Sequence, residues 1–274
     1  MKHIDRQILQ IALPSIVSNI TVPLLGLIDV AIVGHLGSPA YIGAIAVGGM
    51  LFNIIYWIFG FLRMGTSGMT SQAYGKRDLP EIVRLLMRSV GIGLAVALCL
   101  ILLQVPIRQA AFLIIHPTAE VREMATLYFH ICIWGAPAML GLYGLSGWFI
   151  GMQNSRIPMY IAITQNIVNI IASLSFVCFF KMKVEGVAFG TLIAQYAGFI
   201  MGLVLWMSRY GKLKKYILWK GVLQKEAMMR FFQVNRDIFL RTLCLVTVTL
   251  FFTSAGASQG EIILAVNTLL MQLF

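Results

Sequence analysis

Residues 41–62, YIGAIAVGGMLFNIIYWIFGFL, form an unbroken run without a charged side chain. About 20 apolar residues in a helix cross the hydrocarbon core of a bilayer, so this run is long enough to span one. Of the 274 residues, 59% are hydrophobic and 11% are charged, whereas soluble domains carry about 25% charged residues. The composition therefore excludes a water-soluble globular protein. Four cysteines are also too few for a disulfide-stapled secreted fold.

Similar charge-free runs lie on both sides of this one. The expected spans are residues 7–28, 41–62, 89–107, 124–155, 157–180, 186–208 and 242–260, and residues 262–274 begin an eighth. The first run is too long for the core of a signal peptide and contains Pro14 and Pro23, so we expect it to be retained. The sequence thus predicts an all-α, polytopic membrane helical bundle.

The Lys and Arg residues are concentrated in alternate loops. Sixteen lie on the side of the N-terminus, including nine between Arg209 and Arg241, and four lie in the other loops. Cytoplasmic loops carry the excess of Lys and Arg, so we expect a cytoplasmic N-terminus. The net charge of +11 therefore needs no nucleic-acid partner.

A short internal repeat indicates two lobes. Gly37-Ser38, Ala46-Val47 and Leu51 match Gly256-Ala257, Ala265-Val266 and Leu270 at a constant offset of 219 residues. Because many carriers are built from repeated halves, we predict one complete six-helix lobe, a basic cytoplasmic linker, and the first two helices of an incomplete second lobe. These parts are residues 1–208, 209–229 and 230–274. A complete molecule would then have about twice 219 residues, and we expect this truncated chain not to transport alone.

The basic linker has two interpretations. Its lysines and Trp219 fit an interfacial helix that contacts anionic lipid. A plain cytoplasmic linker that follows the topology rule is the interpretation that we favour.

Asp29 is the one acid well inside an apolar stretch, residues 24–33, LLGLIDVAIV. A carboxylate at the membrane centre costs about 2.5–3.5 kcal/mol and usually faces a bundle interior or an aqueous cavity. We interpret Asp29 as a proton or cation site. The alternative is a structural carboxylate that is hydrogen-bonded to a neighbouring helix.

Polar side chains on three further helices are expected at the depth of this acid. Asn166, Asn169 and Ser173 have the spacing i, i+3, i+7, which places them on one face of the fifth predicted helix. Thr191 lies near the outer end of the sixth helix and Tyr128 near that of the fourth. Oxygen atoms of this kind bind hard cations such as Na⁺. Hydrogen bonding between helices is the alternative role for the neutral side chains.

Pro14, Pro23 and Gly26 interrupt the first predicted helix. A proline removes one backbone hydrogen bond and permits a bend. We therefore expect this helix to bend when its acid changes charge, although such prolines also occur in passive membrane helices.

Motifs for other chemistry are missing from the sequence. Gly68–Lys76 lacks the spacing of a phosphate loop, and HExxH and GxSxG do not occur. We therefore expect no enzymatic activity, no cofactor and no metal apart from a coupling Na⁺. Since ATP hydrolysis by this chain is not expected, an ion gradient is left as the energy source.

Several segments resemble the multidrug and toxic compound extrusion (MATE) family. They are Ala12-Leu13-Pro14, residues 26–37 (GLIDVAIVGHLG), residues 59–68 (FGFLRMGTSG), and residues 235–238 (NRDI) with Arg241, the last being similar to the DinF-like branch. The resemblance covers essentially the whole chain. It implies twelve helices in two six-helix lobes that export organic cations and amphiphiles in exchange for H⁺ or Na⁺.

The resemblance also implies roles for individual residues. Asp29 matches the first-helix acid of the family and Pro14 its bending proline. Asn169 and Thr191 match cation-site residues, and Tyr128 matches a tyrosine of the fourth helix.

One position departs from the family pattern. Many relatives carry a second acid on the fifth helix, where this chain has Ser173. Since a site with one carboxylate binds Na⁺ less tightly, we expect H⁺ to be the coupling ion rather than Na⁺.

The overall expectation is a monomeric antiporter in a bacterial inner membrane, in contact with lipid, that exports organic cations or amphiphilic drugs by alternating access. Drug and cation would compete for a first-lobe cavity that includes Tyr128 and Asn166. A flippase for lipid-linked or other amphiphilic substrates is the main alternative. An intramembrane enzyme would need paired catalytic groups, which Asp29 alone does not supply.

Overall fold

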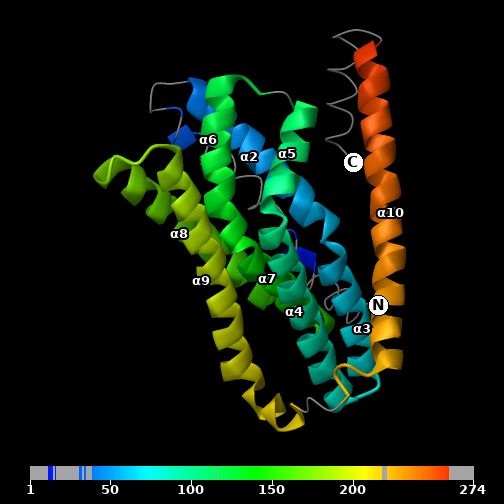
Figure 1. Ribbon diagram of the computed structural model, residues 1–274. Helices are drawn as coiled ribbons and strands as arrows, with labels where there is room; N and C mark the ends of the chain where they lie inside the picture. The colour runs from blue at the N-terminus through cyan, green and yellow to red at the C-terminus, as the bar shows by residue number, and fades with distance from the viewer. Residues whose placement is uncertain are drawn as a thin grey trace.

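The computed structural model describes residues 12–14, 16, 31–32, 34, 39–115, 117–217 and 221–258 (Figure 1). Asp29, Pro23 and Gly26 lie outside these residues, as do most of the first predicted span and all of the eighth. Within the described ranges all regular structure is helical, which confirms the predicted all-α class.

The described part of the chain holds nine α-helices and three short helical turns of other types. Their bounds are α2 (Pro39–Ile58), α3 (Phe61–Gly75), α4 (Leu79–Leu102), α5 (Gln104–Ile115), α6 (Ala119–Cys132), η1 (Ile133–Gly135), α7 (Ala136–Gly151), α8 (Arg156–Leu174), η2 (Ser175–Phe179), α9 (Val184–Tyr210), η3 (Gly211–Tyr216) and α10 (Lys225–Ser258). Of these short segments, η1 and η3 are 3₁₀-helical and η2 is π-helical.

Five helical stretches are long and apolar enough to cross a membrane, and they correspond to the second to sixth predicted spans. They are Ala40–Gly75, Leu79–Leu102, Ala119–Gly151, Arg156–Phe179 and Val184–Tyr216. Residues 242–258 of the seventh predicted span lie within α10, which begins well before them at Lys225, and the last two residues of that span lie outside the described ranges.

Two of the spans are broken near their middle. Gly60 separates α2 from α3, and its backbone N–H donates to the carbonyl of Trp57 at 3.1 Å. Pro137 follows the 3₁₀ turn η1 at the start of α7. Since proline has no N–H and its ring clashes with the carbonyl four residues earlier, it explains the tightened backbone at this point.

Helix α4 begins at Leu79, ten residues before the predicted span at residue 89. Asp78 caps its first turn by accepting a hydrogen bond of 3.1 Å from the N–H of Glu81, and a proline occupies the first turn. Charged residues ended the apolar run in the sequence, but they do not end a helix that is properly capped.

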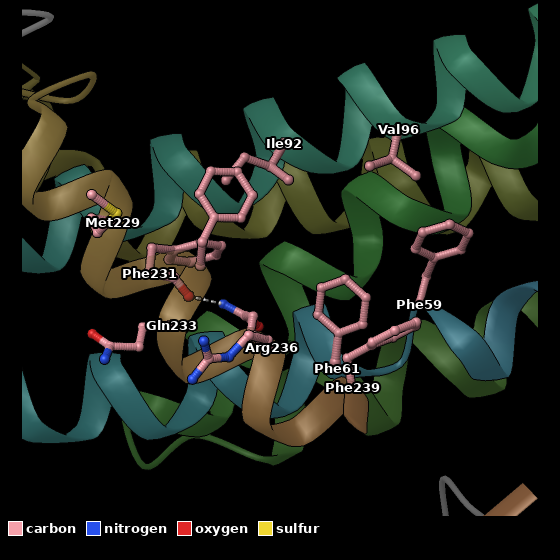
Figure 2. A pocket seen from close by; sticks show the side chains of 11 residues that line it. Phe59, Phe61, Ile92, Val96, Met229, Phe231, Gln233, Arg236 and Phe239 are labelled. Carbon is pink, nitrogen blue, oxygen red and sulfur yellow. Dashed lines mark hydrogen bonds between the residues drawn. The ribbon is translucent and has the colours of Figure 1, made fainter. Parts of the chain in front are cut away.

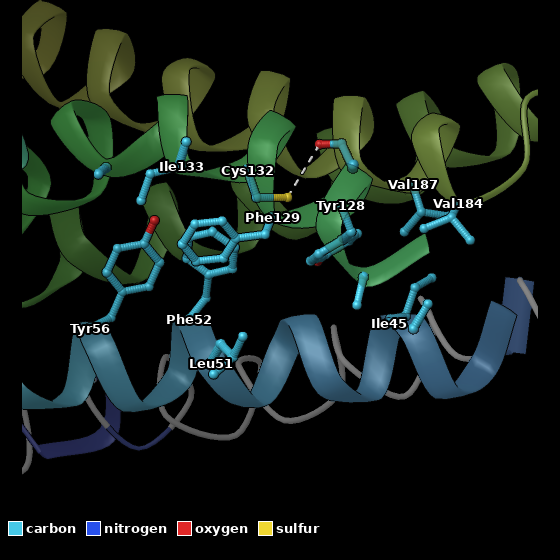
Figure 3. Packing of buried hydrophobic residues seen from close by; sticks show 14 of the residues in the cluster. Ile45, Leu51, Phe52, Tyr56, Tyr128, Phe129, Cys132, Ile133, Val184 and Val187 are labelled. Carbon is cyan, nitrogen blue, oxygen red and sulfur yellow. Dashed lines mark hydrogen bonds between the residues drawn. The ribbon is translucent and has the colours of Figure 1, made fainter. Parts of the chain in front are cut away.

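The core has two apolar clusters. The first joins α2, α6 and α9, and Figure 3 shows Phe52 of α2 against Phe129 of α6, with ring centroids 5.1 Å apart. The second lies between α3, α4, α7 and α9 and is built around Trp148, whose Nε1 donates to the carbonyl of Ile82 at 2.9 Å. Phe231 of α10 is fully buried in this second cluster. The start of α10 is therefore packed on the preceding helices.

Candidate functional site

Helices α8 and α9 approach each other closely because α9 carries small residues on the side that faces α8. Gly186, Gly190, Ala194, Gly198 and Gly202 recur every four residues and are all buried. A Cβ on Gly190 would overlap the hydroxyl of Ser173 and lie 2.8 Å from its backbone nitrogen. Small residues of this kind let membrane helices pack backbone to backbone.

The close contact brings two predicted site residues together. Asn169 of α8 is fully buried, and its Nδ2 donates a hydrogen bond of 3.1 Å to Oγ1 of Thr191 on α9. Ser173 lies one turn further along α8 and is also fully buried. Three of the predicted oxygen-bearing side chains thus lie within about one helical turn of each other at the α8–α9 interface.

Two atoms of this group have no hydrogen-bond partner among the described residues. They are Oδ1 of Asn169 and Oγ of Ser173. A buried polar atom without a partner costs about 1–3 kcal/mol, so both atoms would gain from a bound ion, a water molecule or a further polar side chain. Whether Asp29 supplies that group is a prediction, since this residue lies outside the described part of the chain.

Two other predicted residues are placed differently. Tyr128 is buried in the first apolar cluster, where its ring faces α2 beside Phe52 (Figure 3). A Cβ on Gly48 of α2 would lie 3.0 Å from Cε1 of that ring. Asn166 is half-buried on α8, nearly one turn before Asn169. The roles of both residues in a substrate cavity remain predictions.

Of the three residues expected to bend the first helix, the structure describes Pro14. It is helical and buried. Pro23 and Gly26 lie outside the described ranges, so the bending of this helix stays a prediction.

The sequence analysis did not identify the row of small residues on α9, nor the polar side chain of Gln165 that packs against it. Gln165 lies two turns before Ser173 on α8, and its Nε2 would be 2.6 Å from a Cβ on Gly198. The signal was available, because small residues repeat every four positions from Gly186 to Gly202. That spacing predicts a helix contact face.

We expect Gly190→Ala to destabilise the protein by about 1–3 kcal/mol, because overpacking forces backbone shifts and the added Cβ meets the backbone of Ser173. The measurement is the midpoint of thermal unfolding in detergent, followed by size-exclusion chromatography. Gly91→Ala in α4 is the matched control, since a Cβ there has no heavy atom within 4 Å. An unchanged midpoint for Gly190→Ala would contradict the close contact.

A cavity of about 640 Å³ lies where α10 meets α3 and α4 (Figure 2). Its walls are mostly aromatic and aliphatic, with Arg236, Gln233 and Asn235 as the polar contributors. The lining residues are Phe59, Phe61, Ile92, Val96, Met229, Phe231, Phe232, Gln233, Asn235, Arg236 and Phe239. No acidic side chain is among these described residues.

Beside this cavity, α3 and α10 touch at a glycine. A Cβ on Gly65 would overlap Oδ1 of Asn235 and lie 2.8 Å from its Cγ. Asn235 is buried and held in place, since its Nδ2 donates to the carbonyl of Phe231 at 2.8 Å. The rings of Phe61 and Phe239 extend the contact, with centroids 5.8 Å apart.

Apolar spans broken at glycine and proline, with buried polar groups between them, define a polytopic membrane protein of the helical-carrier class. The family model described as MatE matches residues 14–175. The chain therefore belongs to the MATE transporter family.

Individual proteins with similar sequences support this family assignment. The chain is 38% identical over 273 residues to DNA damage-inducible protein F of Escherichia coli strain K12, covering 98% of this chain and 59% of that protein. It is 20% identical to multidrug export protein MepA of Staphylococcus aureus strain RF122 / ET3-1, covering 87% of this chain and 52% of that protein.

Among solved structures, the fold is similar to that of the Vibrio cholerae MATE transporter VcmN in the bent form. The TM-score is 0.80 at 20% identity, over 98% of this chain and 60% of that one. The chain thus spans 52–60% of the length of these three relatives.

Proposed function

We propose that this chain is part of a cation-coupled antiporter that exports organic cations and amphiphilic drugs, with H⁺ rather than Na⁺ as the coupling ion. The protein would work as a monomer in a bacterial inner membrane, with its N-terminus in the cytoplasm. Residues 1–208 would form the first lobe and residues 230–274 the start of the second. The family and the multi-pass architecture support this proposal, and MepA is a relative named as a multidrug export protein.

The observation that carries the proposal is the buried pair of unpartnered oxygens, Asn169 Oδ1 and Ser173 Oγ, beside the hydroxyl of Thr191. Polar groups inside a membrane bundle are costly and tend to mark ion pathways. Asp29 is expected at the same depth on the first helix. In the proposed cycle, protonation of Asp29 bends this helix around Pro14, Pro23 and Gly26 and expels the drug outward.

The choice of H⁺ follows from the charge of the site. The oxygens that Asn169, Ser173 and Thr191 contribute carry no formal charge, so Asp29 would be the one carboxylate of the group. Tight binding of a hard cation usually requires several anionic or carbonyl ligands. A proton needs a single carboxylate.

The test is ethidium transport in proteoliposomes made with the protein expressed from its complete gene. We expect an imposed proton gradient to drive ethidium transport against its own gradient, and a Na⁺ gradient at constant pH to have little effect. Liposomes without protein are the control. Transport driven by Na⁺ alone would overturn the assignment of the coupling ion, and no transport under either gradient would overturn the drug-export proposal.

The phenylalanine-lined cavity favours a second candidate, a flippase for amphiphiles. Its five phenylalanines suit an acyl chain, and its charged side chain, Arg236, is basic. Translocation of a fluorescent phospholipid in vesicles, without dye transport, would favour this alternative.

A further inference from the structure

Arg88 of α4 makes a long-range contact that the proposed transport cycle has not used. Its Nε donates to the carbonyl of Val222 at 2.8 Å, and its Nη2 donates to the carbonyl of Gly221 at 2.8 Å. Its Nη1 pairs with Oε1 of Glu81 on the same helix at 2.6 Å. One guanidinium thus binds two consecutive carbonyls of the segment that leads from α9 to α10.

The surroundings of Arg88 show that this contact is built into the fold. Its side chain is 1% exposed, and Val222 is 4% exposed. Gly221 has a φ of +104°, a conformation that glycine adopts without strain and other residues rarely do. This turn directs both carbonyls at the guanidinium. If these two carbonyls were withdrawn, Arg88 would keep its ion pair with Glu81 but would leave buried N–H donors without acceptors, which is costly.

The contact sets where α10 begins. Leu223 and Gln224 alone separate Val222 from the first residue of α10, Lys225. Two turns into α10, Phe231 is buried in the second apolar cluster, and Asn235 then reaches Gly65. The N-terminal end of α10 is therefore fixed to α4, and this attachment precedes the contact of α10 with α3 along the chain.

We propose that Arg88 is a positioning residue that clamps the linker to the first lobe and gives α10 a fixed pivot. Movement of the second lobe against the first then occurs beyond Val222, and the α3–α10 contact at Gly65 opens and closes about this pivot. The movement in this proposal rests on the alternating-access function proposed above. The clamp itself does not depend on that function.

The clamp is tested by the reactivity of a cysteine at position 222 in the complete protein, after replacement of all its native cysteines, which include Cys99, Cys132, Cys178 and Cys244. Val222→Cys should react slowly with a maleimide, because this position is 4% exposed. Adding Arg88→Gln should raise the labelling rate at least about tenfold, since the two charge-assisted hydrogen bonds that hold the linker are lost. Arg88→Lys should lie between the two, because lysine lacks the planar fork that reaches both carbonyls.

Arg84→Gln is the matched control. Arg84 lies one turn earlier on α4 and contacts the same Glu81 at 3.7 Å. It approaches the linker at Gly221, where a Cβ would lie 3.3 Å from its Nε, but this Nε has no hydrogen-bond partner within the described residues. Its replacement should leave the labelling of position 222 unchanged. Leu223→Cys, at a position that is 77% exposed, should label rapidly in every background.

Measurements of ethidium export distinguish the two parts of the proposal, which are the clamp at Arg88 and the pivot of α10. Arg88→Gln should lower the maximal rate of ethidium export with little change in KM, because the drug cavity is not altered. Unchanged labelling at position 222 in Arg88→Gln would overturn the clamp. Faster labelling with an unchanged export rate would overturn the pivot and leave the clamp. If the parent protein exports no drug but labelling responds as expected, the proposed function fails and the clamp stands.

Discussion

Asp29→Asn is expected to reduce ethidium export by the complete protein to the level of protein-free vesicles. Asparagine has nearly the shape of aspartate but cannot gain or lose a proton near neutral pH. If Asp29 is the carboxylate that exchanges H⁺ for drug, the variant retains its cavity and loses its link to the proton gradient. The measurement is uphill ethidium transport in proteoliposomes under an imposed pH gradient.

Two further variants make this result specific. Asp29→Glu keeps a titratable carboxylate and should retain part of the coupled export. Asp237→Asn removes an exposed acid on α10 that pairs with Arg236 at 3.1 Å, and it should export normally because exposed ion pairs contribute little. Uphill export by Asp29→Asn at the parental rate would refute the assigned role of Asp29.

The apolar runs predicted the second to sixth spans because crossing a bilayer requires a minimum apolar length. They did not predict where α4 begins, since hydropathy does not register the cap at Asp78. Arg88 lies one residue before the expected third span at residues 89–107, where a loop charge is expected, yet it is buried on α4. Its hydrogen-bond acceptors on the linker, the carbonyls of Gly221 and Val222, lie more than 130 residues away in the sequence, and no local sequence pattern predicts this contact.

The sequence predicted the placement of some candidate-site residues better than that of others, again because contacts between helices are not encoded in a local pattern. Helical spacing predicted that Asn169 and Ser173 share a face, and both are buried at the α8–α9 interface. Depth along a helix, which suggested Thr191 and Tyr128, fixes the level of a side chain but not its direction around the axis. Thr191 meets Asn169, whereas the ring of Tyr128 faces α2 and Phe52. Direction depends on how neighbouring helices are rotated, which requires tertiary packing.

Gly65→Val is expected to have the second large effect, on the contact that closes α3 against α10. The new side chain would occupy the space of the Asn235 amide, which is buried and bonded to the carbonyl of Phe231. Overpacking of this kind costs about 1–3 kcal/mol, or roughly 5- to 150-fold in the population of the closed contact. Export should fall by a similar factor, measured as the initial rate of ethidium transport.

A second substitution identifies the cause of that loss. Asn235→Ala vacates the space beside position 65, so Gly65→Val combined with Asn235→Ala should recover part of the export and of the thermal stability. Gly68→Val is the matched control on the same helix, because a Cβ on Gly68 has no heavy atom within 4 Å. If the double variant is as impaired as Gly65→Val alone, the damage lies elsewhere than at Asn235. The contact that opens and closes during transport would then lie elsewhere than between α3 and α10.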